Sequence, residues 1–172
     1  HSTTYGPPTF ARVGGLCLVE GLIKSGTWGH LATLPATCRP SKRLIFNLNN
    51  HAKTSRVDVE TNGNISWMTG GKDHGWISLS GIRFVTTDAS SAKQPLPLAN
   101  GWKAYGSTFG SPTFALLGSL CVIEGLIKDG GWGHLATLPA SCRPTKRLIF
   151  NLNNGAKTSR VDVETNGKIL WY

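Results

Sequence analysis

The chain has 172 residues, of which 40% are apolar, so it can bury a sizeable core and disorder is not expected. Only 16% are charged, and 21 Gly and 9 Pro recur at short intervals, as turns between strands do. No stretch approaches the roughly 18 uninterrupted apolar residues of a membrane span, so we expect no membrane insertion. The formal charge of +9 comes from single or paired Lys and Arg, which predicts a solvated basic surface and no nucleic-acid partner.

Four cysteines form two pairs that enclose equal lengths of chain, without the CxxC spacing of zinc-binding thiolates. We expect the disulfides Cys17–Cys38 and Cys121–Cys142; free buried thiols and pairing between chains are the alternatives. Disulfides persist in oxidising compartments, and the first residue is His1. These observations predict a mature chain that is secreted and extracellular.

Two carboxylates interrupt apolar strands, Glu20 in LVEGLI and Glu124 in VIEGLI. An unpaired carboxylate would be costly there, so each is expected to have a basic partner. The predicted partners are Arg39 and Arg143.

The motif Trp-Gly-His occurs at residues 28–30 and again at 132–134, followed each time by Leu-Ala-Thr-Leu-Pro. The pattern predicts a strand that ends at a turn. A half-buried indole beside a hydrogen-bonded His is the expected role, and a sugar-facing Trp and His pair is the alternative.

The clearest strands alternate apolar and polar side chains at residues 44–49 and 56–60. The short connection between them predicts an antiparallel hairpin. A turn at residues 61–63 leads to a third strand around Ile65, and Gly70-Gly71 precedes a fourth strand at 76–80. We therefore expect a meander.

Alternation gives this sheet two faces. The expected core face carries Leu44, Phe46, Leu48, Val57, Val59, Ile65, Trp67, Ile77 and Leu79. The expected outward face carries Asn47, Asn49, Arg56, Asp58, Glu60, Ser66, Trp76 and Ser78. Amides and charges can bond sugar hydroxyls while an indole packs on the CH face of a pyranose, so this face is a candidate carbohydrate site. An ordinary solvated face with cross-strand ion pairs is the alternative.

Three acids of the same region, Asp58, Glu60 and Asp73, offer hard oxygen ligands together with the carbonyls of Asn47 and Asn49. They make calcium a candidate cofactor. No EF-hand spacing supports this assignment.

A direct repeat organises the chain. A shift of 104 places aligns residues 1–68 with 105–172, and 50 of the 68 positions are identical. Residues 86–100 are small, polar and Pro-containing, which predicts a linker. The expected fold is all-β, with two tandem antiparallel β-sandwich units at residues 1–85 and 101–172.

Each unit lacks a segment that the other unit has, and the two missing segments lie at different ends of the unit. The second has no counterpart of the strand GWISLSGIRF, and the first has none of Asn100-Gly101-Trp102. A missing strand leaves an open sheet edge, which tends to be covered by another chain or by exchanged segments, so we predict a homodimer. A sandwich with one strand fewer is the alternative.

No enzyme is expected, because the sequence has no GxSxG elbow, HExxH motif or phosphate-binding glycine loop. Asp58 and Glu60 lie two apart on one strand and do not flank a scissile glycosidic bond from opposite sides. The sequon Asn64-Ile65-Ser66 occurs only in the first repeat and fits secretion.

Three segments, VEGLIKSGTWGHLATLP, RPSKRLIFNLNN and GGKDHGWISLSGI, resemble a family of cnidarian secreted repeat proteins that includes galactose-binding tandem-repeat lectins of sea anemones. The resemblance covers nearly the whole chain. It implies a dimeric β-sandwich lectin that recognises terminal β-linked galactose, as in lactose, with calcium as a candidate bridge to the sugar hydroxyls.

The site that this resemblance implies falls on the outward face of the meander and its margin. Its residues are Asn47, Asn49, Arg56, Asp58, Glu60, Asp73, His74 and Trp76. The second repeat offers Asn151, Asn153, Arg160, Asp162 and Glu164 but no counterpart of Asp73, His74 or Trp76. We therefore predict a secreted, multivalent, agglutinating lectin for galactose-containing glycans of cell surfaces. A structural matrix or coat protein without a soluble sugar ligand is the alternative.

Overall fold

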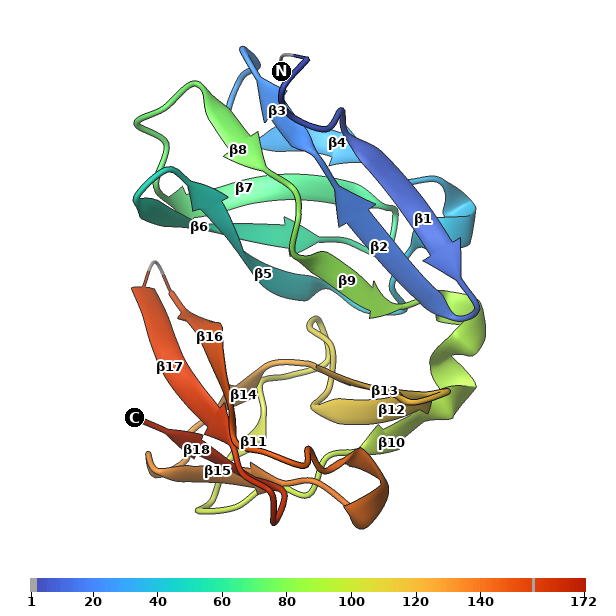
Figure 1. Ribbon diagram of the computed structural model, residues 1–172, viewed down its shortest axis with the longest axis vertical. Coiled ribbons are helices and arrows are strands. Elements are labelled where there is room, and N and C mark those ends of the chain that lie inside the picture. Colours follow the sequence, from blue (N-terminus) through green and yellow to red (C-terminus); the bar gives the residue numbers. More distant parts are fainter. Residues whose placement is uncertain (1–2, 156) are drawn as a thin grey trace.

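A computed structural model describes residues 3–155 and 157–172. Its regular structure is almost entirely β-strand, in several antiparallel sheets, which confirms the predicted all-β class (Figure 1). Among the described residues, no helix is long and apolar enough to cross a membrane.

The first repeat forms three sheets. The largest has the order β4-β7-β6-β5, with bounds His30–Thr33, Asn64–Gly70, Lys53–Val59 and Leu44–Asn50. The second has the order β1-β2-β9, with bounds Thr9–Val13, Leu16–Glu20 and Ile82–Val85. The third pairs β3 (Leu22–Lys24) with β8 (Trp76–Ser78), and a short 3₁₀ turn, η1 (Ala36–Cys38), follows β4.

The second repeat returns the largest sheet in the same order, β15-β18-β17-β16. Its strands are His134–Thr137, Lys168–Trp171, Lys157–Val163 and Leu148–Asn154, with the 3₁₀ turn η3 at Ala140–Cys142. The other sheets are β10-β12-β13, with bounds Lys93–Pro95, Thr113–Leu117 and Leu120–Glu124, and β11-β14, with bounds Lys103–Ala104 and Ile127–Lys128. The large sheet therefore recurs in both repeats, whereas the third strand of the three-stranded sheet adds to β2 in the first repeat and to β12, the equivalent of β1, in the second.

The hydrophobic core of the first repeat lies between the large sheet and the strands β2, β8 and β9. Of the expected core face, the buried members are Leu44, Leu48, Val57, Val59, Ile65, Ile77 and Leu79. Phe46 and Trp67 are partly buried and pack against this cluster. The period-two pattern thus predicts correctly which face of these strands is apolar.

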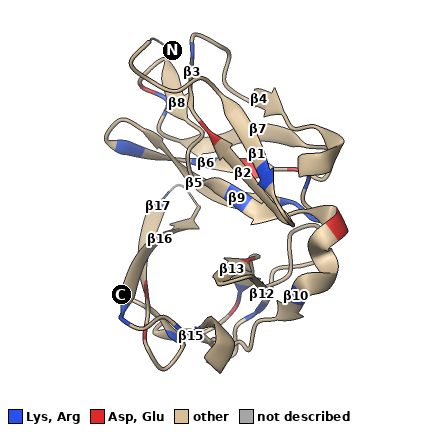
Figure 2. Cartoon of the chain, turned by 45° about the vertical axis from the view of Figure 1, so that its right-hand side comes forward, with Lys and Arg blue, Asp and Glu red and all other residues tan. Residues whose placement is uncertain are grey.

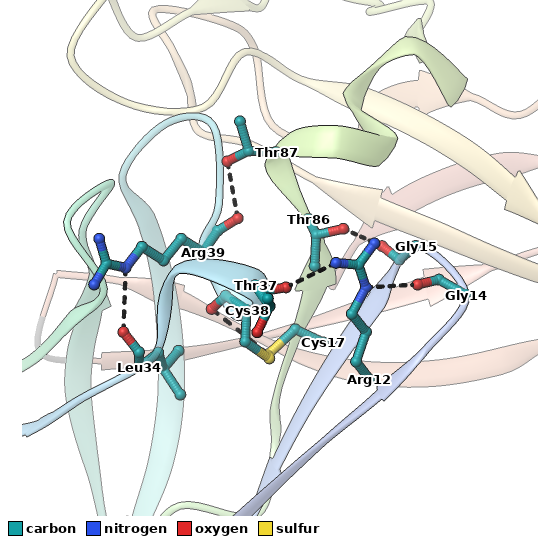
Figure 3. Close-up of a disulfide and its surroundings, with 10 residues drawn as sticks. All are labelled: Arg12, Gly14, Gly15, Cys17, Leu34, Thr37, Cys38, Arg39, Thr86 and Thr87. Atoms are coloured by element: carbon teal, nitrogen blue, oxygen red, sulfur yellow. Dashed lines mark hydrogen bonds between the residues drawn. A yellow bond between two sulfur atoms is a disulfide. The ribbon is translucent and has the colours of Figure 1, made fainter.

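Both predicted disulfides are present, Cys17–Cys38 and Cys121–Cys142. Figure 3 shows the first, which ties β2 to η1. Beside it the Arg12 guanidinium donates to the carbonyl oxygens of Gly14 at 2.9 Å and Thr37 at 3.2 Å. The disulfide therefore lies beside these hydrogen bonds, at the place where β2 and η1 meet.

The predicted partners of the two strand glutamates are wrong. Arg39 Nε donates to the carbonyl of Leu34 at 3.1 Å, and Glu20 is exposed to solvent, where a carboxylate needs no partner. Glu124 instead forms an ion pair with Lys93 and accepts a hydrogen bond from the Val85 amide at 3.1 Å. Its partners come from residues preceding the second repeat, so the sequence motif around Arg143 does not reveal them.

The segment expected to be a linker is ordered. It contains the 3₁₀ helix η2 (Thr87–Ala92) and strand β10, and Leu98 bridges to Ala136 of β15. Leu96 and Leu98 pack against the apolar cluster of the second repeat. Its polar composition reflects its exposed side, whereas its few apolar residues pack against the neighbouring apolar clusters.

A third apolar cluster joins the repeats. Leu16 and Val85 of the first repeat meet Ala115 and Val122 of the second. Because this cluster crosses the expected boundary, the division into two sandwich units stays a prediction. Figure 2 shows Lys and Arg spread over separate strands and loops of both halves.

The repeat provides a matched test of core burial. Leu48 and Leu152 occupy the same place in identical LIFNLNN strands, yet they are 2% and 46% exposed. We expect Leu48→Ala to lower the free energy of unfolding by about 2 to 5 kcal/mol, because it opens a cavity. Leu152→Ala is the control and should cost about 0.5 kcal/mol or less. Equal losses in denaturant unfolding would contradict the difference in burial.

Candidate functional site

A hollow of about 500 Å³ opens on the first repeat. It is lined by Tyr5, Gly6, Gly21, Leu22, Asn49, His51, Trp76, Ser78 and Ser80. These residues come from the segment before β1, from the β2–β3 junction, from the end of β5 with its following turn and from the strand β8 with its following turn. The hollow therefore gathers four parts of the chain that are distant in sequence.

The alternation of side chains along β8 determines which of them face the hollow. Along β8 and the following turn, Ile77 and Leu79 are buried in the core, whereas Trp76, Ser78 and Ser80 line the hollow. Pairing with β3 holds this wall in place, since Ser78 lies opposite Leu22. The predicted outward direction of Trp76 and Ser78 agrees with this geometry.

The β2–β3 junction requires glycine. Gly21 has a φ of +103°, and a Cβ there would lie 2.1 Å from the carbonyl oxygen of Pro7. Its amide donates to Ser80 Oγ at 3.2 Å and its carbonyl accepts from the Leu79 amide at 2.8 Å. This close approach brings the N-terminal segment, with Tyr5, against the hollow.

Three aromatic rings lie together at the β5–β6 end. The His51 ring centroid is 4.5 Å from that of His74 and 6.4 Å from that of Trp76, and His74 and Trp76 are 5.9 Å apart. The group presents π faces and ring N–H groups beside the hydroxyls of the serines. Such a combination can pack against an apolar ring face and bond its polar edge.

His51 adopts a conformation that favours glycine. Its φ is +60°, and the equivalent residue of the second repeat is Gly155, with φ +67°. A left-handed backbone costs roughly 1 kcal/mol or more for a residue with a Cβ, and such strain is concentrated at functional sites. The cost is consistent with a role for the imidazole in the hollow.

Asn50 fixes the loop that carries His74 and Trp76. Its side chain is fully buried, and Nδ2 donates to the carbonyl oxygens of His74, at 3.1 Å, and of Trp76. In return its Oδ1 accepts from the His74 amide at 3.4 Å. The equivalent Asn154 is exposed, since the second repeat has no such loop. Asn50 was not predicted as a site residue; its only sequence signal is the double Asn that ends the strand.

The expected exposure of Asp58 is wrong. Its side chain is 0% exposed, and its carboxylate accepts from Arg43 Nε at 2.7 Å and from Arg56 Nε at 2.8 Å. The Phe109 ring lies under both guanidinium groups, 5.3 and 6.0 Å from their central carbons. The hydrogen bond that Arg56 donates to Asp58 raises the pKa of Arg56. This outward face is closed by an ion pair and an aromatic ring from the second repeat.

Asp162, the equivalent acid of the second repeat, is also buried and paired with an arginine. Its expected exposure is therefore wrong too. The Asp162 side chain is 0% exposed and accepts from Arg160 Nε at 2.8 Å. Glu164 forms an ion pair with Arg147, which lowers the pKa of that carboxyl. Tyr172 covers the pair, with the guanidinium carbon of Arg160 5.2 Å from its ring centroid. These charges satisfy one another.

The remaining candidates divide between the hollow and other surfaces. Asn49 lines the hollow. Asn47 Oδ1 accepts from Asn153 Nδ2 at 2.8 Å, so these two amides join the repeats. Asp73 forms an ion pair with Lys53, and Glu60 and Asn151 do not line the hollow. Within residues 3–155 and 157–172, no group of three His, Cys, Asp or Glu side chains is placed to hold a metal ion, so Asp58, Glu60 and Asp73 are not brought together.

The histidine of the Trp-Gly-His motif is hydrogen-bonded in both repeats, as expected; the expected half-buried indole holds for Trp28 but is wrong for Trp132, which is 51% exposed. His30 Nε2 and Thr33 Oγ1 are 2.9 Å apart, as are His134 Nε2 and Thr137 Oγ1. The Trp28 ring packs 5.6 Å from Trp67. None of these residues lines the hollow.

The chain matches no family model, curated protein or solved structure in three separate comparisons. The resemblance to cnidarian repeat lectins therefore stays a prediction.

Asn50 and Asn154 provide a matched test of loop anchoring. Asn50→Ala leaves the carbonyls of His74 and Trp76 without a donor, so we expect a loss of about 1 to 3 kcal/mol in the free energy of unfolding. The exposed Asn154→Ala should stay within about 0.5 kcal/mol of the wild type. Denaturant unfolding measures both. Equal stability of the two variants would remove the anchoring role.

The ion pair of Asp162 predicts an acid dependence of stability. Hydrogen bonding by Arg160 lowers the pKa of Asp162 below its unfolded value of about 3.9. The pair therefore stabilises fully above about pH 4 and is lost as the pH falls through the native pKa. We expect Asp162→Asn to lower Tm at pH 7 and to flatten the fall of Tm below about pH 4. Parallel Tm curves for variant and wild type would contradict this.

Proposed function

We propose that the chain binds carbohydrate, with galactosides as the ligand class, in the hollow beside Trp76. The observation that carries the proposal is the placing of one indole face beside an amide, two serine hydroxyls and an imidazole, all on one open wall. A pyranose has an apolar CH face and a polar rim of hydroxyls, and such a wall matches both. Galactose enters through the sequence resemblance alone.

In this arrangement each side chain has a separate task. Trp76 packs on the CH face, while Asn49, Ser78 and Ser80 exchange hydrogen bonds with hydroxyls. His51 closes the end of the hollow and supplies a ring nitrogen. No bond in the ligand is made or broken, because binding needs no nucleophile or general base here.

The valency is limited because residues 101–172 do not repeat the side chains that line the hollow. The second repeat has Gly155 in place of His51 and no counterpart of residues 72–80. Agglutination of cells needs two linked sites, since the second contact gains from effective concentration. A homodimer is therefore part of the proposal, and two disulfides fit a secreted protein.

Calorimetric titration with lactose, with calcium and again after chelation, tests the proposal. Binding under both conditions supports a metal-free site, and loss on chelation makes calcium essential. No heat under either condition, followed by no binding on a galactoside array, would overturn it.

Trp76 provides the site-specific test. We expect Trp76→Ala to weaken lactose binding by about 1 to 3 kcal/mol, because it removes the apolar contact. Trp132→Ala is the matched control, since Trp132 is 51% exposed on the second repeat and outside the hollow. Titration calorimetry measures both. Unchanged affinity of Trp76→Ala would remove the indole from the site.

A structural matrix or coat role is the second candidate. It is favoured by the large apolar side chains that the second repeat leaves exposed, among them Leu148, Phe150 and Leu152. Concentration-dependent assembly beyond a dimer in sedimentation, unaffected by lactose or chelator, would support it.

A further inference from the structure

The two repeats place one sequence in two environments. The strands β5 and β16 both read LIFNLNN. Leu44 and Leu48 are 4% and 2% exposed, whereas Leu148 and Leu152 are each 46% exposed. Because the strands are identical, the difference lies in what covers them.

In the first repeat the cover is the segment of residues 76–85, which forms β8 and β9. The Phe84 ring lies 6.3 Å from that of Phe46. A Cβ on Gly81 would be 3.5 Å from Leu48 Cδ2, so the backbone of the segment passes directly over this strand. The segment contributes Ile77, Leu79, Ile82 and Phe84 to the core.

The same segment also completes the neighbouring sheet. Val19 of β2 lies opposite Ile82 of β9 and is 4% exposed. Its equivalent in β13, Ile123, is 41% exposed. Among the described strands β13 pairs only with β12, so its other edge has free backbone groups.

We propose that the second repeat has an acceptor face, formed by Ile123, Leu148, Phe150 and Leu152, for a strand segment of another polypeptide. The segment has the pattern of residues 76–85, with large apolar side chains at the positions of Ile77, Leu79, Ile82 and Phe84. Its backbone adds to the free edge of β13, and its apolar side chains cover β16. This is recognition by strand addition, with side chains setting the specificity.

A second copy of this chain cannot fill the face by exchange. Residues 1–172 contain one such segment and two faces that fit it, so every face filled by exchange between copies uncovers another. The proposed occupant is a segment with this pattern that covers no core of its own, in a different polypeptide. The first repeat shows the side-chain chemistry that it needs.

A synthetic peptide of residues 72–85 tests the inference on the full chain. We expect the fluorescently labelled peptide to bind saturably at a 1:1 ratio and to raise Tm. A control peptide with Ile82→Asp and Phe84→Asp should bind about tenfold more weakly or not at all, since burial of two apolar side chains is lost. Absence of binding by the unmodified peptide would overturn the inference.

Two substitutions on β16 locate the binding. Phe150→Asp places a charge in the acceptor face and should weaken peptide binding about tenfold or more. Ile149→Asp is the matched control, because Ile149 is 60% exposed and, as the adjacent residue of the strand, points to the opposite face. Both side chains are exposed in the free chain, and circular dichroism verifies the fold.

Equal binding to both variants would contradict the assignment of the face. A dimer that forms through Phe150 and excludes the peptide would also overturn it, in favour of a second copy. Lactose titration of the same variants separates this inference from the proposed function, because the hollow lies on the first repeat. Failure of either one leaves the other standing.

Discussion

The difference between the two repeats depends on how the apolar face of the LIFNLNN strand is covered. In the first repeat the segment of residues 76–85 covers that face, and alternation gives the segment a second role. Its inward side chains, Ile77 and Leu79, complete the core, while Trp76, Ser78 and Ser80 form a wall of the hollow. Core and candidate site are two sides of one segment. Residues 101–172 contain no such segment, and the apolar face of their LIFNLNN strand is exposed.

The features that could be predicted from the sequence are those that residues close together in the chain determine. Period-two patterns predicted the buried faces of β5, β6 and β8, and equal spacing predicted both disulfides. It also placed Asn49 and Trp76 on the outward side that lines the hollow. These features need only the geometry of one strand or hairpin.

The features that could not be predicted are those that depend on contacts between residues far apart in the sequence. The burial of Asp58 requires Arg43 from before its hairpin and Phe109 from the second repeat, and no local pattern brings these together. Tyr5 reaches the hollow only because Gly21 allows close backbone approach. Polar composition likewise concealed the order of residues 86–100, since a few apolar contacts suffice to fix an exposed segment.

One contact between the repeats joins two residues that occupy equivalent positions of the repeat. Thr54 Oγ1 and Thr158 Oγ1 are 2.9 Å apart, and their sequence separation of 104 equals the repeat shift. Here the two hairpins meet through equivalent residues, as subunits do across a two-fold axis. The two threonines belong to one polypeptide and are separate positions of its sequence, so a substitution at either one changes only one side of the contact. Unlike a contact between identical subunits, this internal contact can become asymmetric one residue at a time.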